Sequence, residues 1–165
     1  MAWLLVLAVA PSVFWLWYFR RRDRLRPEPR HLVGLVFAYG ALAALLAGAL
    51  EEVIFRVTDL PGTGTLPSGV AAAGLIGLIE ESAKFAALYV GIYRHAQFDE
   101  IIDGILYAVA ASLGFATLEN IAYVLEGGTD VGVLRAALSV PGHAFFGAVM
   151  GFYVGLAKFS SRPLA

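Results

Sequence analysis

The sequence has no cysteine and little charge. Because cysteine is absent from the 165 residues, disulfides, thiolate metal sites and cysteine nucleophiles are excluded. Charged residues make up only 15% of the chain, hydrophobic residues make up 59%, and the mean hydropathy is +0.75. This composition is typical of a membrane protein and excludes an ordinary soluble domain. Any chemistry must therefore come from Glu, Asp, His, Lys, Ser or Asn side chains.

Apolar runs long enough to cross a bilayer alternate with short polar loops. About 20 apolar residues, at roughly 1.5 Å rise each, span the hydrocarbon core as a helix. We therefore predict an all-α fold, a polytopic transmembrane helix bundle of about five membrane-spanning helices in one domain covering the whole chain. The predicted helices cover residues 2–19, 32–55, 69–93, 101–125 and 134–157.

Positive charge gathers in the loops on one side of the predicted bundle. The loop Arg20–Arg30 contains six arginines, and Arg94 and Lys158 fall on the same side, whereas Arg56 and Arg135 fall on the other. The positive-inside rule then predicts an outside N-terminus and a cytoplasmic C-terminus, in a multi-pass protein of the cell membrane. The basic loop is interpreted as a contact with anionic lipid, and no nucleic-acid partner is expected.

The middle of the third apolar run carries three charged residues, Glu80, Glu81 and Lys84. A charge that faces lipid at this depth costs about 2.5–3.5 kcal/mol per residue on insertion scales. Such residues therefore face the protein interior or a water-filled cavity. Two adjacent carboxylates with a lysine one turn later mark a candidate functional site.

Buried polar residues on three predicted helices fall at overlapping depths. Counted from the outer helix ends at about 1.5 Å per residue, Glu80 and Glu81 lie about 17 Å deep, Glu119 about 9 Å and His143 about 14 Å. His143 also shares a helix face with glycines at every fourth position, and small residues let helices approach closely. We therefore expect His143 to point into the bundle, toward the glutamates.

These residue types suit hydrolysis by either of two routes. In the first, Glu80 or Glu81 takes a proton from water, and Asn120 or protonated His143 stabilises the oxyanion. In the second, Glu81, Glu119 and His143 hold a divalent metal such as Zn or Mn, whose bound water becomes the nucleophile. The residues themselves leave both routes open, and they leave open which of the adjacent glutamates is the base.

Other polar residues are assigned smaller roles. Lys84 is four residues after Glu80 and would balance its charge. Asp103, at the inner end of the fourth run, is expected to be supporting or structural. Glu51 and Glu52 close the second run, where we expect a solvated helix end.

Three motifs, in order and spacing, resemble the PrsW family of intramembrane proteases. They are EESAK at 80–84, DGILYAVAASLGFATLEN at 103–120 and PGHAFFGAVMGFYVG at 141–155. The segment DRLRPEP at 23–29 resembles the first cytoplasmic loop of that family. A looser similarity extends to the CAAX-protease/bacteriocin-processing superfamily.

The resemblance implies an intramembrane endopeptidase that cuts a membrane-anchored protein near its extracytoplasmic side, as in site-1 cleavage of an anti-sigma factor. Carried over by position, Glu80 and Glu81 match the essential pair of the family. Phe115 and Glu119 match its second motif, and His143 matches its third. The resemblance leaves the choice between a glutamic and a metal-dependent protease open.

The same buried acids could instead serve a proton- or ion-coupled transporter. Transporters often carry internal repeats with broken helices at matching positions. The two halves of this sequence contain no such repeat, and about five helices do not divide evenly into two repeats. The protease hypothesis is therefore preferred, and ion flux in proteoliposomes would support the alternative.

Overall fold

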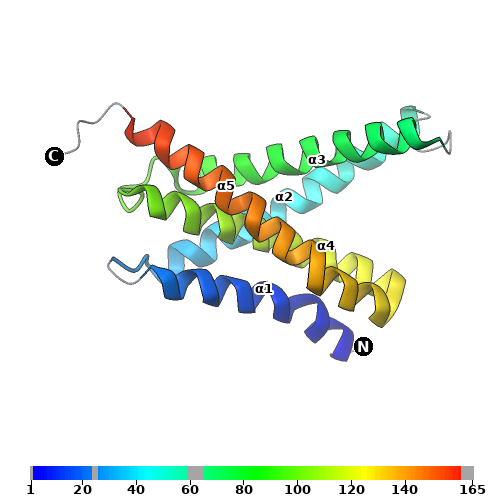
Figure 1. Cartoon of the computed structure of the whole chain (residues 1–165), viewed down its shortest axis with the longest axis horizontal. Coiled ribbons are helices and arrows are strands. Elements are labelled where there is room, and N and C mark those ends of the chain that lie inside the picture. Colours follow the sequence, from blue (N-terminus) through cyan, green and yellow to red (C-terminus); the bar gives the residue numbers. More distant parts are fainter. Residues whose placement is uncertain (1, 24–25, 59–64, 161–165) are drawn as a thin grey trace.

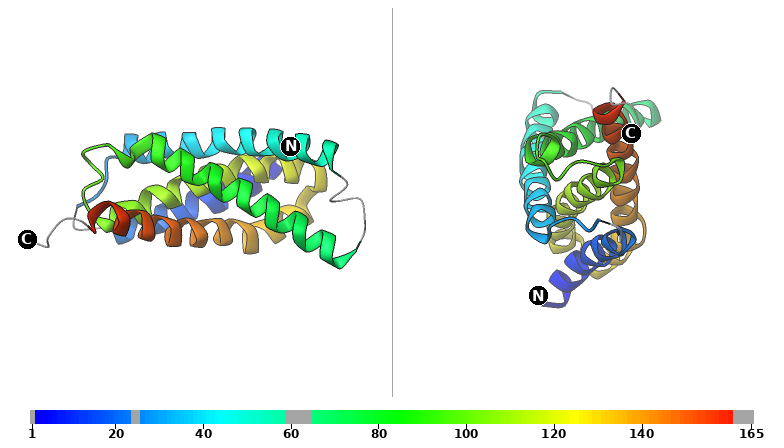
Figure 2. Two further views of the ribbon diagram at one scale, coloured as in Figure 1. Left: turned by 90° about the horizontal axis from the view of Figure 1, so that it is seen from above. Right: turned by 90° about the vertical axis from the view of Figure 1, so that its left-hand side faces the viewer.

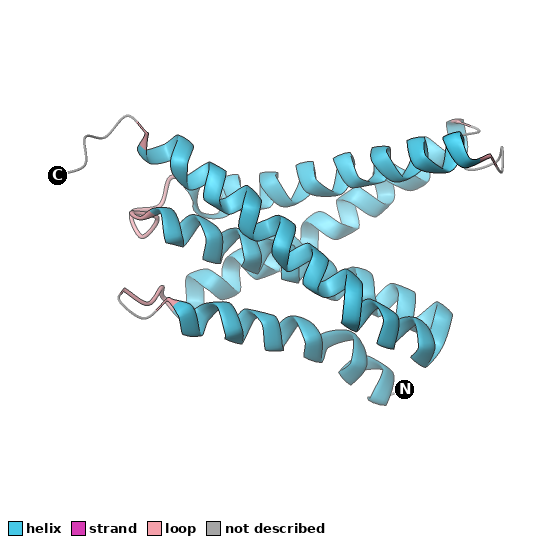
Figure 3. Ribbon diagram, viewed as in Figure 1, coloured by secondary structure: helices cyan, strands magenta, loops and turns pink. Residues whose placement is uncertain are grey.

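The computed structural model describes residues 2–23, 26–58 and 65–160, and every described element is helical (Figures 1 and 3). Positions 1, 24–25, 59–64 and 161–165 lie outside the described residues, so parts of the predicted basic and outer loops do too. The all-α prediction is confirmed. In chain order the elements are α1 Ala2–Arg22, α2 Arg30–Val57, α3 Leu66–Leu88, η1 Tyr89–Tyr93, α4 Ile101–Leu134, η2 Arg135–Ser139 and α5 Val140–Phe159, where η marks a π-helix.

Among the described residues, three helical stretches are long and apolar enough to cross a membrane. They are α1, α2 and the continuous stretch Ile101–Phe159 of 59 residues. Many large apolar side chains point outward, including Leu46 and Val90, as a surface facing lipid requires. The count of five crossings and the orientation of the termini stay predictions.

The stretch Ile101–Phe159 reverses direction at Gly128. This residue has φ 70° and ψ −157°, a conformation that essentially only glycine adopts without strain. The two arms of the stretch then lie side by side (Figure 2). The segment between the predicted helices 101–125 and 134–157 is therefore helical on both sides of a kink, because one glycine suffices for the reversal.

Helix α4 forms the centre of the bundle and packs against α1, α2 and α5. Almost every residue in its first half is buried. Glycines let its backbone approach its neighbours, since a methyl group on Gly114 would overlap the carbonyl oxygen of Phe37 in α2. A methyl group on Gly151 of α5 would likewise overlap the carbonyl oxygen of Gly104. The glycines that follow His143 thus face the bundle, as the sequence predicted.

The end of α4 where Asp103 lies is held by its own hydrogen-bond network. The backbone N–H groups of Asp99 and Glu100 donate to Oδ2 of Asp103, at 3.0 and 2.6 Å. One turn on, the buried hydroxyl of Tyr107 donates to the Glu28 carboxylate. Asp103 therefore caps α4, and Tyr107 anchors the loop before α2, well away from the other predicted site residues.

Candidate functional site

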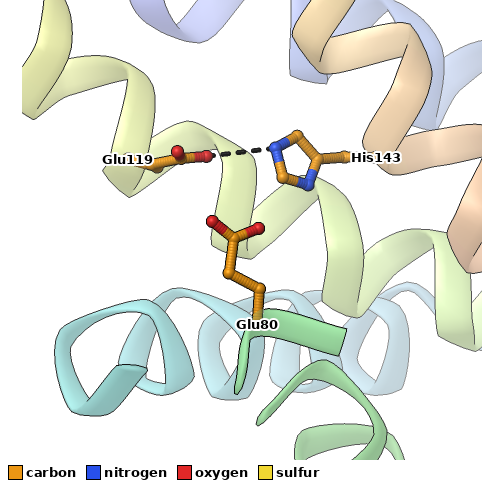
Figure 4. Close-up of side chains that lie close together, drawn as sticks. All are labelled: Glu80, Glu119 and His143. Atoms are coloured by element: carbon orange, nitrogen blue, oxygen red, sulfur yellow. Dashed lines mark ion pairs between the residues drawn. The ribbon is translucent and has the colours of Figure 1, made fainter. Parts of the chain in front are cut away.

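Side chains from α3, α4 and α5 converge where those helices pass one another. Figure 4 shows Glu80, Glu119 and His143 pointing toward a common centre. Nε2 of His143 lies 3.0 Å from Oε2 of Glu119. All three side chains are largely buried, with exposed fractions of 16%, 19% and 11%. The sequence placed these residues at overlapping depths, and the structure brings their side chains together.

Lys84 links the two glutamates of α3 to the histidine of α5. Its Nζ atom lies 3.1 Å from Oε2 of Glu80 and 2.8 Å from Oε1 of Glu81. It also lies 2.8 Å from Nδ1 of His143 and 4.4 Å from the centre of the Phe115 ring. The lysine is completely buried, and a buried charge is tolerated only when paired in this way. Phe115 thus belongs to the site as a wall beside the ammonium.

These contacts indicate where the proton of His143 lies. An ammonium group only donates, so Nδ1 of His143 accepts from Lys84. Nε2 then carries the proton and faces Oε2 of Glu119 at 3.0 Å. The imidazole is therefore fixed in orientation by a partner on each side.

The structure groups Glu80 with Glu119 and His143, whereas the sequence predicted Glu81 as the third member of the metal-ligand set. One ligand atom from each of Glu80, Glu119 and His143 lies within 4.8 Å of the others. Adjacent helix positions differ by about 100°, so the two glutamates point in different directions. The Glu81 side chain is 39% exposed. Sequence depth alone does not separate them, because both lie at the same level.

Arg135 is a site residue that sequence reasoning missed, because it was counted as an outer-loop charge. It is the first residue of η2, and its Nη2 lies 2.8 Å from Oε2 of Glu119. Its Nε donates to Oδ1 of Asn120 at 2.6 Å. Asn120 therefore contributes to the site by holding the Arg135 side chain in position. Arg135 lies eight residues before His143, just over two helical turns, and this spacing was the available signal.

The expectation for Glu51 is corrected. Instead of ending α2 in solvent, Glu51 borders a chamber of about 440 Å³ between α2, α3 and α4, together with Glu80 and Glu119. Its Oε1 atom is buried and has no hydrogen-bond partner among the described residues. Glu52 does fit the original expectation, since it is exposed and pairs with Arg56. The helix continues beyond Glu51 to Val57, which keeps Glu51 inside the bundle.

A second cavity, the α3–α5 groove, opens on the other side of Glu80. It has a volume of about 650 Å³ and a mainly apolar surface, and Glu80, Glu81, Arg135 and His143 are among the residues that line it. The η2 segment forms part of its wall. In η2 the Val140 N–H donates to the carbonyl of Arg135, five residues earlier, and such π-helical segments are frequent at functional sites.

The charge around the site is unbalanced. The two cavities are bordered by four carboxylates, Glu51, Glu80, Glu81 and Glu119, against the two cations Lys84 and Arg135 that pair with them. In a low-dielectric site this excess attracts a cation or protons. A histidine with two carboxylates is also a suitable ligand set for zinc or manganese. The donor set therefore fits a divalent metal.

Comparison with known proteins agrees with this chemistry. The family model described as "PrsW family intramembrane metalloprotease" matches residues 28–165. Curated relatives named "Protease PrsW" include one from Geobacillus kaustophilus, 41% identical over 93% of this chain and 66% of its own length. Those from Bacillus subtilis and Clostridioides difficile are 38% and 34% identical, over 93% and 96% of this chain, and each is covered to 68%.

This chain spans about two thirds of the length of these relatives. No solved structure matches it significantly.

Proposed function

The chain belongs to the PrsW family of intramembrane proteases, as its motifs predicted, and we propose that it is itself an intramembrane endopeptidase. The observation that carries this proposal is the convergence of Glu80, Glu119 and His143 beside an open groove. The transporter alternative is not favoured, because the family and its relatives are proteases.

A divalent metal would be held by Glu80, Glu119 and His143. When present, it acts as a Lewis acid and activates a bound water. A metal held by His143 through Nε2, the ring atom that faces Glu119, would displace the proton on that atom. Lys84 would keep the ring in place from the other side, through Nδ1. Zinc and manganese both suit these ligands.

Glu81 is then the residue proposed to move the proton. It adjoins the ligand set without being part of it, borders the groove, and is held by Lys84 at 2.8 Å. In the proposed reaction, Glu81 takes a proton from the attacking water and later gives it to the leaving nitrogen. This assignment separates the two adjacent glutamates by role, with Glu80 as ligand and Glu81 as base.

The substrate would be a membrane-anchored protein whose cleaved segment enters the α3–α5 groove. The apolar lining of the groove suits a chain arriving from the bilayer. The arginine-rich C-terminal end of α1 and the start of α2 lie at the opposite end of the bundle from the turn between the two arms of Ile101–Phe159 (Figure 1), which supports cleavage near the extracytoplasmic side of the cell membrane. An anti-sigma factor is one candidate substrate, suggested by the family resemblance.

The proposal is tested by cleavage of a panel of tagged single-pass membrane proteins in membranes. Wild type is compared with Glu80→Gln, Glu81→Gln and His143→Ala, and bound metal is measured in each purified variant. We expect all three to lose cleavage, with metal lost in Glu80→Gln and His143→Ala but kept in Glu81→Gln. Glu52→Gln is the matched control, because Glu52 is exposed and lies outside both cavities.

Equal cleavage by wild type and Glu80→Gln would overturn the proposed function. Equal metal content in Glu80→Gln and wild type would overturn only the division of roles between the glutamates.

A further inference from the structure

The guanidinium of Arg135 is held on three sides. Its Nε donates to Oδ1 of Asn120 at 2.6 Å, and its Nη2 pairs with Oε2 of Glu119 at 2.8 Å. Its central carbon lies 4.2 Å from the centre of the Tyr123 ring, a cation–π contact. Asn120 is itself fixed, since its Nδ2 donates to the carbonyl of Ala8 in α1. A long, flexible side chain is thus kept in one position.

This position brings Arg135 to the edge of the α3–α5 groove, together with Glu81 and His143. A guanidinium has five N–H donors, and Asn120 takes one of them. Among the described residues that border the groove, Arg135 is the only one with a permanent positive charge. Lys84 is enclosed behind the glutamates and is shared among Glu80, Glu81 and His143.

We propose that Arg135 is a further catalytic residue, whose guanidinium donates hydrogen bonds to the carbonyl oxygen of the peptide bond that is cut. The inference rests on the proposed function. It also replaces the donors expected from sequence, because the Asn120 donor Nδ2 is engaged with the carbonyl of Ala8 and Nε2 of His143 faces Glu119 at 3.0 Å.

The step follows the ordinary course of peptide hydrolysis. The water oxygen bonds to the carbonyl carbon, its proton passes to Glu81, and the carbonyl electron pair moves onto oxygen. Arg135 stabilises the oxyanion so formed. The oxyanion then re-forms the carbonyl, the carbon–nitrogen bond breaks, and the leaving nitrogen takes the proton from Glu81. The products are a carboxylic acid and an amine, with Arg135 unchanged.

A simpler role, neutralising Glu119, would require only a nearby cation. The bond to Asn120 and the stacking on Tyr123 add a defined orientation, which charge neutralisation does not need. A planar donor fixed in direction is what stabilisation of a developing charge requires. The two roles therefore differ in how they depend on the geometry of the side chain.

The test measures kcat and KM for Arg135→Gln and Arg135→Lys, with bound metal and thermal unfolding in detergent as controls. Arg135→Gln should lower kcat about 100- to 1,000-fold, as loss of an oxyanion donor does, with KM changed less than about threefold. Arg135→Lys keeps the charge but loses the planar fork, and its kcat should fall at least about tenfold. Methylguanidinium added to Arg135→Ala should restore part of kcat.

Arg56→Gln is the matched control, because Arg56 also pairs with a glutamate but is exposed at the end of α2. If Arg135→Lys has the kcat of wild type, the inference is overturned. This result is decisive even if Arg135→Gln does not fold. If Glu80→Gln is inactive while the Arg135 variants cut normally, the protease stands and only the role of Arg135 fails. If Glu80→Gln cuts as well as wild type, the proposed function fails and the inference fails with it.

Discussion

Nζ of Lys84 lies 2.8 Å from Nδ1 of His143, a contact between residues 59 positions apart. Lys84 also pairs with both adjacent glutamates, and His143 pairs with Glu119. This contact therefore joins the charged groups of α3 to those of α4 and α5 in one continuous network. The network depends on a lysine that has no exposed surface.

Replacement of Lys84 by methionine should destabilise the protein and abolish cleavage. The variant leaves two carboxylates near His143 without their cation, and breaking a buried pair in this way costs about 3–5 kcal/mol. Thermal unfolding in detergent and the cleavage assay measure the two effects. Lys84→Met combined with Glu81→Gln should recover part of the lost stability, because one uncompensated carboxylate is removed.

Arg56→Met is the control for this prediction, since it breaks an exposed pair with Glu52 and should change stability by less than about 1 kcal/mol. An unfolding temperature for Lys84→Met equal to that of wild type would contradict the prediction.

Removal of divalent metal should lower both activity and stability. A chelator should stop cleavage and reduce the unfolding temperature, and zinc or manganese should restore both. A metal present at 100 times its Kd stabilises the folded state by about 2.7 kcal/mol. His143→Ala should lose this stabilisation, whereas His95→Ala should retain it, because His95 is exposed at the loop before α4. Undiminished cleavage in metal-free detergent would instead favour a glutamic protease.

Glu28 should make stability decrease with rising pH. Burial raises the pKa of Glu28 from 4.5 to about 7, with Tyr107 and the carboxylates of Asp23 and Asp103 as its neighbours. Between these pH values the folded protein keeps a proton that the unfolded chain releases. Folding is therefore most favoured at low pH, and this contribution is lost as pH rises through about 7.

Glu28→Gln should flatten this dependence, because glutamine does not titrate. Unfolding temperatures measured from about pH 5 to pH 8 check the prediction, with Glu52→Gln as an exposed control. The same slope in Glu28→Gln and wild type would rule out Glu28 as its source.

Gly128→Ala should destabilise the reversal of direction within α4. The residue has φ 70° and ψ −157°, and a side chain there is strained by about 1–3 kcal/mol. Gly74→Ala is the matched control, because Gly74 lies within α3 and open space surrounds its Cβ position. The control should be neutral or stabilising by about 0.5–1 kcal/mol. Equal unfolding temperatures for the two variants would refute this account of the reversal.

The sequence predicted the helices and the convergence of the site because both follow from spacing along the chain. Charges in apolar runs must face inward, and their depths follow from helical rise. The choice between Glu80 and Glu81 depends on the rotation of α3 against its neighbours, which depth does not reveal. Arg135 was missed because the positive-inside rule counts charges by side and ignores the direction in which they point.

Glu51 was misjudged for a related reason. The acids near the end of the predicted helix 32–55 were assigned to a solvated helix end, but α2 runs on to Val57, six residues past Glu51. The connection between the predicted helices 101–125 and 134–157 was likewise expected to be a loop, but a single glycine at positive φ leaves the surrounding sequence free to stay helical. Both errors concern where a helix ends, which is the least certain feature of any sequence pattern.

Glu80 borders two separate cavities, the groove beside α5 and the chamber beside α2. Hydrolysis within a bilayer must bring together an apolar peptide, which comes from the lipid, and water, which the lipid excludes. In the proposed protease, two cavities that meet at one carboxylate would let each reactant reach Glu80 separately. A peptide bound in the α3–α5 groove would then leave the chamber beside α2 free to hold water for the next bond to be cut.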